Sequence, residues 1–187
     1  MSGRFDVLKT AIPGLHVLQR KSLGDKRGYL ERLFCNQELN ELTSGKEIVQ
    51  INHTLTESRG TVRGMHFQYP PHAEVKLISC LKGEVFDVAV DLRKGSPTFL
   101  QWHAEILSAE NHKSLAIPEG FAHGFQTLTD DCELIYLHTA AYESSAEAGV
   151  HPQDTRLSIQ WPLPVHQLSP RDSAHSLLDE SFTGVSL

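Results

Sequence analysis

The sequence predicts an all-β fold, a sandwich or barrel of short strands with a few short peripheral helices. From Glu47 to about Tyr142, short apolar runs are separated by glycine, proline or polar pairs, a pattern typical of such a fold. Residues 84–92 alternate between two faces, as a β-strand does. Only residues 36–45 have convincing helical spacing, so helices contribute little to the prediction.

Length and composition indicate one domain that binds a small molecule. The chain has 187 residues, of which 40% are hydrophobic and 21% are charged, as is ordinary for a single globular domain. The formal net charge of -6 argues against a broad nucleic-acid surface. We therefore expect small-molecule partners and no nucleic acid.

The cysteines and the N-terminal residues indicate a cytoplasmic protein. Cys35, Cys80 and Cys132 are odd in number, widely spaced and form no CxxC motif, so neither a disulfide framework nor a thiolate zinc site is expected. The first residues contain no apolar signal segment, and no run approaches the roughly 20 apolar residues of a membrane span. We expect no membrane partner.

Two short strands and a helix are expected before the barrel. Residues 7–19 are apolar and are interrupted by Pro13-Gly14, a turn pair that separates two extended pieces. Residues 36–45 predict a surface helix that Asn36 caps and Gly45 ends, with its leucines three apart on one face.

The clearest strand is residues 84–92, and its two faces differ. One face carries only apolar side chains, whereas the other carries small and acidic ones. Such a face suits a barrel interior that holds a polar ligand, but exposure to solvent explains it equally well. The apolar face holds Phe86, Val88, Val90 and Leu92, and the other holds Val85, Asp87, Ala89 and Asp91.

The remaining elements follow at short intervals. Further strands are expected at residues 102–107 and from Ser114. From Leu163 onward, proline-containing turns precede a possible helix over residues 172–179, so this segment is expected to wrap over the barrel.

The stretch from Arg63 to Gln68 is the first candidate for chemistry. Arg63 stays charged at any working pH and can hold an anion with a planar fork of donors, while His66 can exchange a proton near neutrality. An anion clamp beside a base is a plausible part of an active site. A half-buried histidine on an ordinary strand is the alternative.

The second candidate is the stretch from Ile117 to Phe125, which resembles the second half of the cupin signature, PxGxxH. Metal-binding cupins also have an HxH pair and a glutamate, and the pair is missing here. A divalent ion usually needs three or four converging ligands. A metal-dependent cupin enzyme, such as a dioxygenase or isomerase, would have to use His66, Glu74 and His123.

With these stretches in place, the chain resembles the dTDP-4-dehydrorhamnose 3,5-epimerase family, nucleotide-sugar epimerases of the cupin superfamily. The likeness covers nearly the whole chain, and although each motif is weak alone, seven in the same order are specific. The motifs stand here as Lys9–Gly14, Gly24–Gly28, Arg63–Gln68, Gly83–Asp91, Ser96–Phe99, Leu107–Asn111 and Ile117–Phe125.

The resemblance implies a cupin-type double-stranded β-helix (jelly roll), a homodimer, and neither a metal nor an organic cofactor. We expect one domain, 1–187, with N-terminal strands and a short helix in 1–47, the jelly-roll core in 48–142 and a C-terminal wrap in 143–187. The implied enzyme is an isomerase that inverts C3 and/or C5 of a 4-keto-6-deoxyhexose nucleotide, of the dTDP-4-dehydro-6-deoxyglucose to dTDP-4-dehydrorhamnose type. It would serve dTDP-rhamnose biosynthesis and polysaccharides such as the lipopolysaccharide O-antigen.

The resemblance also assigns roles to individual residues. His66 matches the proton acceptor, Asp172 the acid that pairs with it, and Tyr136 the proton donor on the opposite face of the sugar. From the residues alone, Tyr136 could instead be a core side chain, Lys76 a solvated strand lysine and Asp172 a helix N-cap. The substrate-binding positions of the family fall on Arg27, Glu31, Gln50, Asn52, Arg63, Lys76, His123, Glu147 and Arg171.

These residue types suit epimerisation next to a ketone. A hydrogen alpha to a ketone is acidic because the carbanion charge spreads onto oxygen, so the site needs a base at carbon and a donor or cation at oxygen. His66 and Lys76 suit these two roles. An ionised Asp172 would hold one ring nitrogen of His66 as N–H and leave the other free.

The chain departs from the family pattern at the nucleotide end. It has Ala116 and Ala141 where many members have aromatic residues, with Tyr142 next to the second. Stacking on a base is worth about 1–3 kcal/mol, so an epimerase acting on a CDP-linked deoxysugar is an alternative. A sugar-nucleotide binding protein without catalysis is another, although it would have little reason to keep His66, Tyr136 and Asp172 together.

Overall fold

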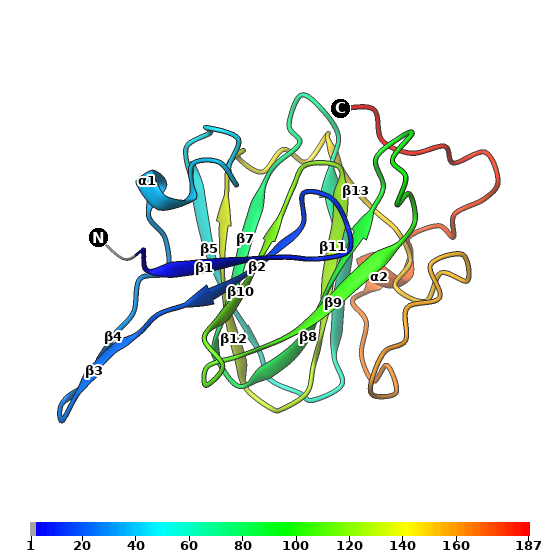
Figure 1. Cartoon of the computed structure of the whole chain (residues 1–187). Coiled ribbons are helices and arrows are strands. Elements are labelled where there is room, and N and C mark those ends of the chain that lie inside the picture. The colour runs from blue at the N-terminus through cyan, green and yellow to red at the C-terminus, as the bar shows by residue number, and fades with distance from the viewer. Residues whose placement is uncertain (1–2) are drawn as a thin grey trace.

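The computed structural model describes residues 3–187, and its body is made of two antiparallel sheets that face each other (Figure 1). The all-β, cupin-type jelly-roll prediction is confirmed. The six-stranded sheet has the order β1(Phe5–Lys9), β2(His16–Arg20), β10(Lys113–Ile117), β7(Lys76–Lys82), β12(Cys132–His138) and β5(Gln50–Thr56). The five-stranded sheet has the order β13(Glu147–Gly149), β6(Val62–Gln68), β11(Phe121–Thr127), β8(Glu84–Asp91) and β9(Trp102–Ser108).

Strand β8 is buried on both faces. Val85 and Ala89 pack between the two sheets, whereas Val88 packs with residues of the C-terminal segment on the outer face of the five-stranded sheet. Asp87 and Asp91 are fully buried. The predicted faces are therefore correct, and solvent exposure of the acidic face is wrong.

The N-terminal residues extend the six-stranded sheet. Strands β1 and β2 form a hairpin that adds to β10. A second hairpin, β3(Leu23–Asp25) and β4(Gly28–Leu30), projects away from the body of the molecule (Figure 1).

The predicted helix over residues 36–45 is shorter in the structure. It is a single turn, α1(Asn36–Leu39), whose N-cap residue is Cys35, so the capping role of Asn36 is wrong. The chain then continues in overlapping turns to Gly45, whose N–H donates to Asn40 O over 2.8 Å. Leu39 is buried, and Leu42 packs partly buried against the same cluster, so the leucine spacing serves packing even where the helix has ended.

The C-terminal segment covers the outer face of the five-stranded sheet and contributes one strand to its edge (Figure 1). The helix expected over residues 172–179 is instead α2(Pro170–Ser173). Ser169 caps it and Pro170 occupies its first turn, where proline's missing N–H costs nothing. The single-domain division into 1–47, 48–142 and 143–187 stays a prediction, although strands from the first and last parts join the two main sheets.

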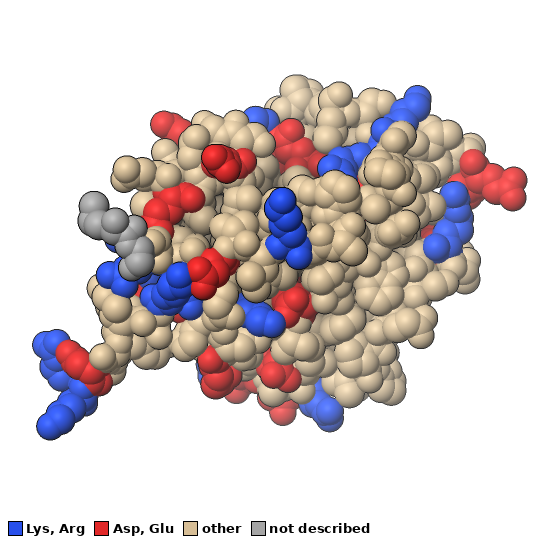
Figure 2. All heavy atoms as spheres, viewed as in Figure 1, with Lys and Arg blue, Asp and Glu red and all other residues tan. Residues whose placement is uncertain are grey.

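Charges on the face shown in Figure 2 are of both signs and interspersed, and a cluster of them marks the tip of the projecting hairpin. No helix among the described residues is long and apolar enough to cross a membrane.

Strands β6 and β11 approach each other closely at Gly64 and Gly124. Gly64 has φ +134°, and a Cβ there would lie 2.5 Å from Gly124 Cα and 2.9 Å from His123 O. Strands β6 and β11 can therefore meet at this point only because both residues are glycine.

We predict that Gly64→Ala lowers the free energy of unfolding by roughly 3 kcal/mol or more, because backbone strain and a backbone clash add. Gly95→Ala is the matched control, since Gly95 also has a positive φ but a Cβ there meets nothing within 4 Å. We expect it to cost only roughly 1 kcal/mol. Urea denaturation of both variants checks this, and equal losses would contradict the steric explanation.

Candidate active site

A cavity of about 880 Å³ opens between the two sheets. Residues of β5, β7 and β12 line one wall, residues of β6 and β11 line the other, and residues 167–172 close one side. Ten of the twelve predicted site residues line it, namely Gln50, Asn52, Arg63, His66, Lys76, His123, Tyr136, Glu147, Arg171 and Asp172.

His66 and Asp172 form a dyad. His66 Nε2 lies 2.7 Å from Asp172 Oδ1, and the other carboxylate oxygen accepts the N–H of Gly64 over 3.2 Å. Burial alone would raise the pKa of Asp172, but the hydrogen bond and charge of His66 outweigh it and hold that pKa below its ordinary value. Asp172 is therefore an anion that fixes Nε2 as N–H, and His66 Nδ1 has no hydrogen-bond partner within residues 3–187.

The local sequence explains how Asp172 reaches His66 across 106 residues. Ser169 accepts the backbone N–H of Asp172 over 3.0 Å and starts helix α2. Asp172 thus occupies the first turn of the helix rather than its N-cap, so the capping alternative is wrong. Its side chain is free to turn toward the cavity.

Tyr136 lies on the facing sheet. Burial, and next the charge of Asp87, raise the pKa of Tyr136, so the phenol keeps its proton. His123 is the cross-strand partner of His66, and its Nε2 lies 2.9 Å from Asp87 Oδ2. The ring of His123 meets the ring of Tyr136 edge to face at 6.0 Å, so Tyr136 borders the cavity and is not only a core side chain.

Two cations enter the cavity wall from opposite sheets. Lys76 is 8% exposed, so it is not a solvated strand lysine, and its Nζ lies 3.0 Å from Glu74 Oε1. Arg63 Nε donates to Thr56 Oγ1 over 2.9 Å. Both cations are oriented before any ligand arrives.

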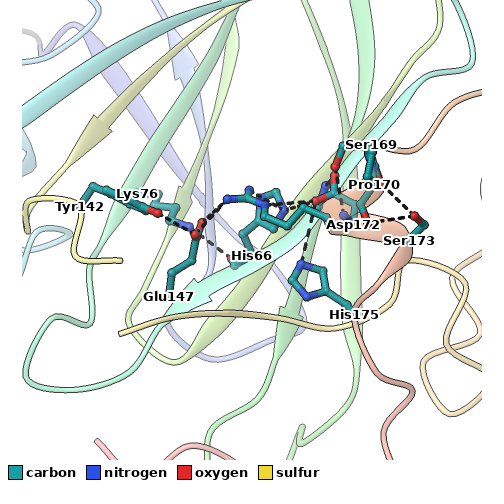
Figure 3. Close-up of polar contacts among 11 residues, drawn as sticks. His66, Lys76, Tyr142, Glu147, Ser169, Pro170, Asp172, Ser173 and His175 are labelled. Carbon is teal, nitrogen blue, oxygen red and sulfur yellow. Dashed lines mark hydrogen bonds and ion pairs between the residues drawn. The ribbon is translucent and has the colours of Figure 1, made fainter. Parts of the chain in front are cut away.

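A line of polar contacts crosses the cavity mouth (Figure 3). Tyr142 Oη donates to Glu147 Oε2 over 2.9 Å. Arg171 Nη1 donates to the same carboxylate over 2.9 and 3.0 Å, and Arg171 Nε lies 3.7 Å from Asp172 Oδ1. The mouth is therefore polar, exposed and linked to the dyad.

Two predicted substrate residues lie outside this cavity. Arg27 is at the tip of the projecting hairpin, with 89% of its side chain exposed and paired with Asp25. Glu31 follows the hairpin and is buried against Arg20 and His112, at 3.0 and 2.8 Å. Within one chain, neither residue can reach a ligand in the cavity.

The ligand set of the metal alternative does not assemble. Glu74 is bound by Lys76 and His138, and His123 is bound by Asp87. Across residues 3–187, the one group with three potential ligand atoms near one another is His66, Asp172 and His175, within 4.8 Å. Within that group, His66 and Asp172 already bind each other.

Comparison with known proteins gives a consistent result. The sequence profile of the family "dTDP-4-dehydrorhamnose 3,5-epimerase" matches residues 9–180. The chain belongs to that family. It is 45% identical to the dTDP-4-dehydrorhamnose 3,5-epimerase of Salmonella typhimurium, over 94% of this chain and 97% of the relative. It is also 36% identical to a dTDP-4-dehydrorhamnose 3-epimerase of Streptomyces niveus, over 91% of this chain and 82% of the relative.

A solved relative has the same fold. The structure of the 3,5-epimerase of Legionella pneumophila in complex with dTDP-4-keto-L-rhamnose superposes with a TM-score of 0.87 and 41% identity, covering 92% of each chain. The protein is thus an isomerase of the epimerase class, and the metal-dependent alternative finds no support.

Several residues that line the cavity of this epimerase have no role in the sequence predictions, three of them with polar side chains near the predicted ones. Gln68, His138 and Tyr142 all line the cavity. The signal for His138 was available, because it follows Tyr136 by two residues on β12 and so shares its face. Gln68 and Tyr142 gave no comparable signal, since they depend on where β6 and the loop after β12 end.

We predict that Asp172 stabilises the epimerase in a pH-dependent way. Its folded-state pKa is lowered, so its contribution is full above about pH 5 and is lost as the pH falls below about 4. Asp172→Asn should therefore lower the free energy of unfolding by roughly 1–3 kcal/mol at pH 7, and the difference from wild type should shrink at pH 3. Urea titrations at both pH values measure this. Exposed Asp131→Asn is the control, and a difference that persists at pH 3 would contradict the assignment.

Proposed function

We propose that this epimerase inverts C3, C5 or both in a dTDP-linked 4-keto-6-deoxyhexose. One observation carries the proposal: a histidine of one sheet, paired with a carboxylate of helix α2, and a protonated, partly buried tyrosine of the facing sheet border the same cavity. Inversion at carbon needs a base on one side of the sugar ring and an acid on the other. The cavity volume of about 880 Å³ suits a ligand of this size.

Abstraction begins at His66. Its free Nδ1 takes the hydrogen alpha to the ketone as a proton, the C–H electron pair forms the carbon–carbon double bond, and the carbonyl π pair moves to the keto oxygen. Lys76 donates an N–H to that oxygen as its charge grows. Asp172 stabilises the imidazolium that results, because the pair then carries opposite charges.

Reprotonation completes the inversion. Tyr136 donates its phenolic proton to the same carbon from the other face, and the ketone reforms. Because burial keeps Tyr136 protonated, it is an acid until the enolate appears. The charge of Arg63 opposes the raised pKa, so this arginine helps to stabilise the phenolate.

The polar mouth suits the nucleoside diphosphate. Arg63 and Arg171 offer guanidinium groups, whose planar forks match phosphate oxygens. Tyr142, which shares the Glu147 carboxylate with Arg171, provides an aromatic ring there. The relatives named above act on dTDP sugars, and this favours dTDP over CDP.

We predict that the wild-type epimerase exchanges H3, H5 or both of dTDP-4-keto-6-deoxyglucose in D₂O. His66→Asn should slow exchange ~10²–10⁴-fold because the base is lost. Tyr136→Phe should retain exchange on the His66 face and slow product formation by about 10²-fold or more. ¹H NMR follows both, with His53→Asn, an exposed histidine outside the cavity, as control. Absence of wild-type exchange with the dTDP substrate, but exchange with its CDP counterpart, would move the proposal to that nucleotide.

We also propose a homodimer in which the projecting hairpin of one copy completes the site of the other. Tyr29 and Leu30 on this hairpin are 62% and 73% exposed, which is costly for large apolar side chains in water. Arg27 is a substrate residue by family resemblance, but it lies outside its own cavity. A second copy resolves both points.

We predict that Arg27→Ala and His66→Asn complement each other when the two variants are mixed and allowed to exchange subunits. If Arg27 acts in the partner's site, a heterodimer has one intact site, and statistical mixing restores about a quarter of wild-type activity. If Arg27 acts in its own chain, no mixture exceeds its two components. Light scattering of wild type verifies the dimer.

We further propose a cytoplasmic location. Cys35, Cys80 and Cys132 are all free, as is usual in a reducing compartment. Fractionation of the source cells tests this, and recovery from an oxidising compartment would contradict it.

A further inference from the structure

A buried carboxylate in the cavity wall has no part in the mechanism above. Glu74 precedes β7, and only 8% of its side chain is exposed. Its Oε1 faces Lys76 Nζ at 3.0 Å, and its Oε2 lies 3.1 Å from His138 Nδ1 and 3.3 Å from Gln68 Nε2. Every donor around this carboxylate belongs to a residue that also lines the cavity.

The contacts of Lys76 leave one donor for a ligand. An ammonium has three N–H groups. One is directed to Glu74 Oε1, and a second donates to the carbonyl oxygen of His66 over 3.3 Å. With two donors held by the protein, the direction of the third is fixed, and Lys76 lines the cavity.

The group also ties the two sheets together. Lys76 and His138 are cross-strand partners on β7 and β12 of the six-stranded sheet, whereas Gln68 and His66 lie on β6 of the five-stranded sheet. Glu74 therefore sits where the strand that carries the base meets the strand that carries the cation. A shift of this carboxylate would change the distance between the base and the oxygen donor.

Glu74 is ionised. Burial alone would raise the pKa of Glu74, but the hydrogen bond from His138 and the charge of Lys76 outweigh it and hold the pKa below its usual value. An ionised, fully paired carboxylate is rigid, whereas a neutral one would release Lys76.

We propose that Glu74, braced by His138 and Gln68, is a positioning residue that aims the Lys76 ammonium at the keto oxygen of the substrate. This inference rests on the proposed function for the identity of the oxygen. We call Glu74, Lys76, His138 and Gln68 together the clamp. The geometry of the clamp does not depend on the proposed function. Misplacing one catalytic group by about 1 Å can cost ~10² in rate, so a residue of this kind acts on kcat rather than on binding.

The test is Glu74→Gln, which keeps the size of the side chain and removes its charge. We expect kcat to fall by about tenfold to a hundredfold, with KM and the Kd of free dTDP within about threefold of wild type. Glu133→Gln is the matched control, because Glu133 pairs with Lys82 and His53 at a more exposed site outside the cavity. It should leave kcat unchanged.

A second readout needs no substrate. In crystal structures without substrate, the Lys76 ammonium should leave its wild-type position when Glu74 is replaced by glutamine, because the cation has lost its charged partner. If this displacement occurs but wild type has no epimerase activity, the clamp stands and the proposed function fails. An unchanged position of Lys76 Nζ, or an unchanged kcat in an active enzyme, overturns the clamp.

A merely structural role would give a different pattern. Glu74→Gln would then lose dTDP affinity and thermal stability together with kcat, and this outcome also overturns the proposal. If that variant does not fold, Glu74→Asp carries the test, since it keeps the charge and moves it by one methylene. It should displace the Lys76 ammonium and lose about tenfold in kcat, whereas wild-type kcat would refute positioning.

Discussion

The site depends first on the hydrogen bond between His66 and the carboxylate of Asp172. Asp172 belongs to a segment that lies outside the jelly roll, and its carboxylate spans from helix α2 to the backbone of Gly64 and the ring of His66. This one group fixes the histidine tautomer, closes one side of the cavity and attaches the C-terminal segment to β6. Because burial opposes its ionisation, the pair persists only where both hydrogen bonds are made.

The facing sheets provide what a single strand cannot. An inversion needs an acid and a base on opposite sides of the sugar ring, and the two sheets present Tyr136 and His66 from opposite walls. Every second residue of β12 faces the interior because side chains alternate along a strand. Leu134 lies in the core between the sheets, and Tyr136 and His138 line the cavity. Strand β12 therefore contributes both to the apolar core and to the polar wall of the cavity.

The faces of the strands were easier to predict from the sequence than the ends of the helices. The alternation in residues 84–92 placed Asp87 and Ala89 on one face, because period-two patterning follows directly from strand geometry, and the structure shows that this face is the buried one. Helix limits were less predictable: Ser169 and Pro170 determined the start of α2, and α1 ends after one turn, where the chain continues in local turns to Gly45. The pairing of His66 with Asp172 came from family resemblance, since no local pattern links residues 106 positions apart.

The buried polar pairs that line or support the cavity lower the stability of the fold relative to apolar packing. Lys76 with Glu74, His123 with Asp87 and His66 with Asp172 each remove an ion pair or a polar pair from water. Apolar residues of similar volume would often be neutral or stabilising by about 1–4 kcal/mol in such places. Each of these pairs instead holds a cavity-facing nitrogen in one direction, and a reaction that moves a proton between opposite faces of a ring needs fixed directions more than it needs a tighter core. The cost in stability is therefore concentrated where orientation has value, while apolar packing between the sheets below the cavity supports it.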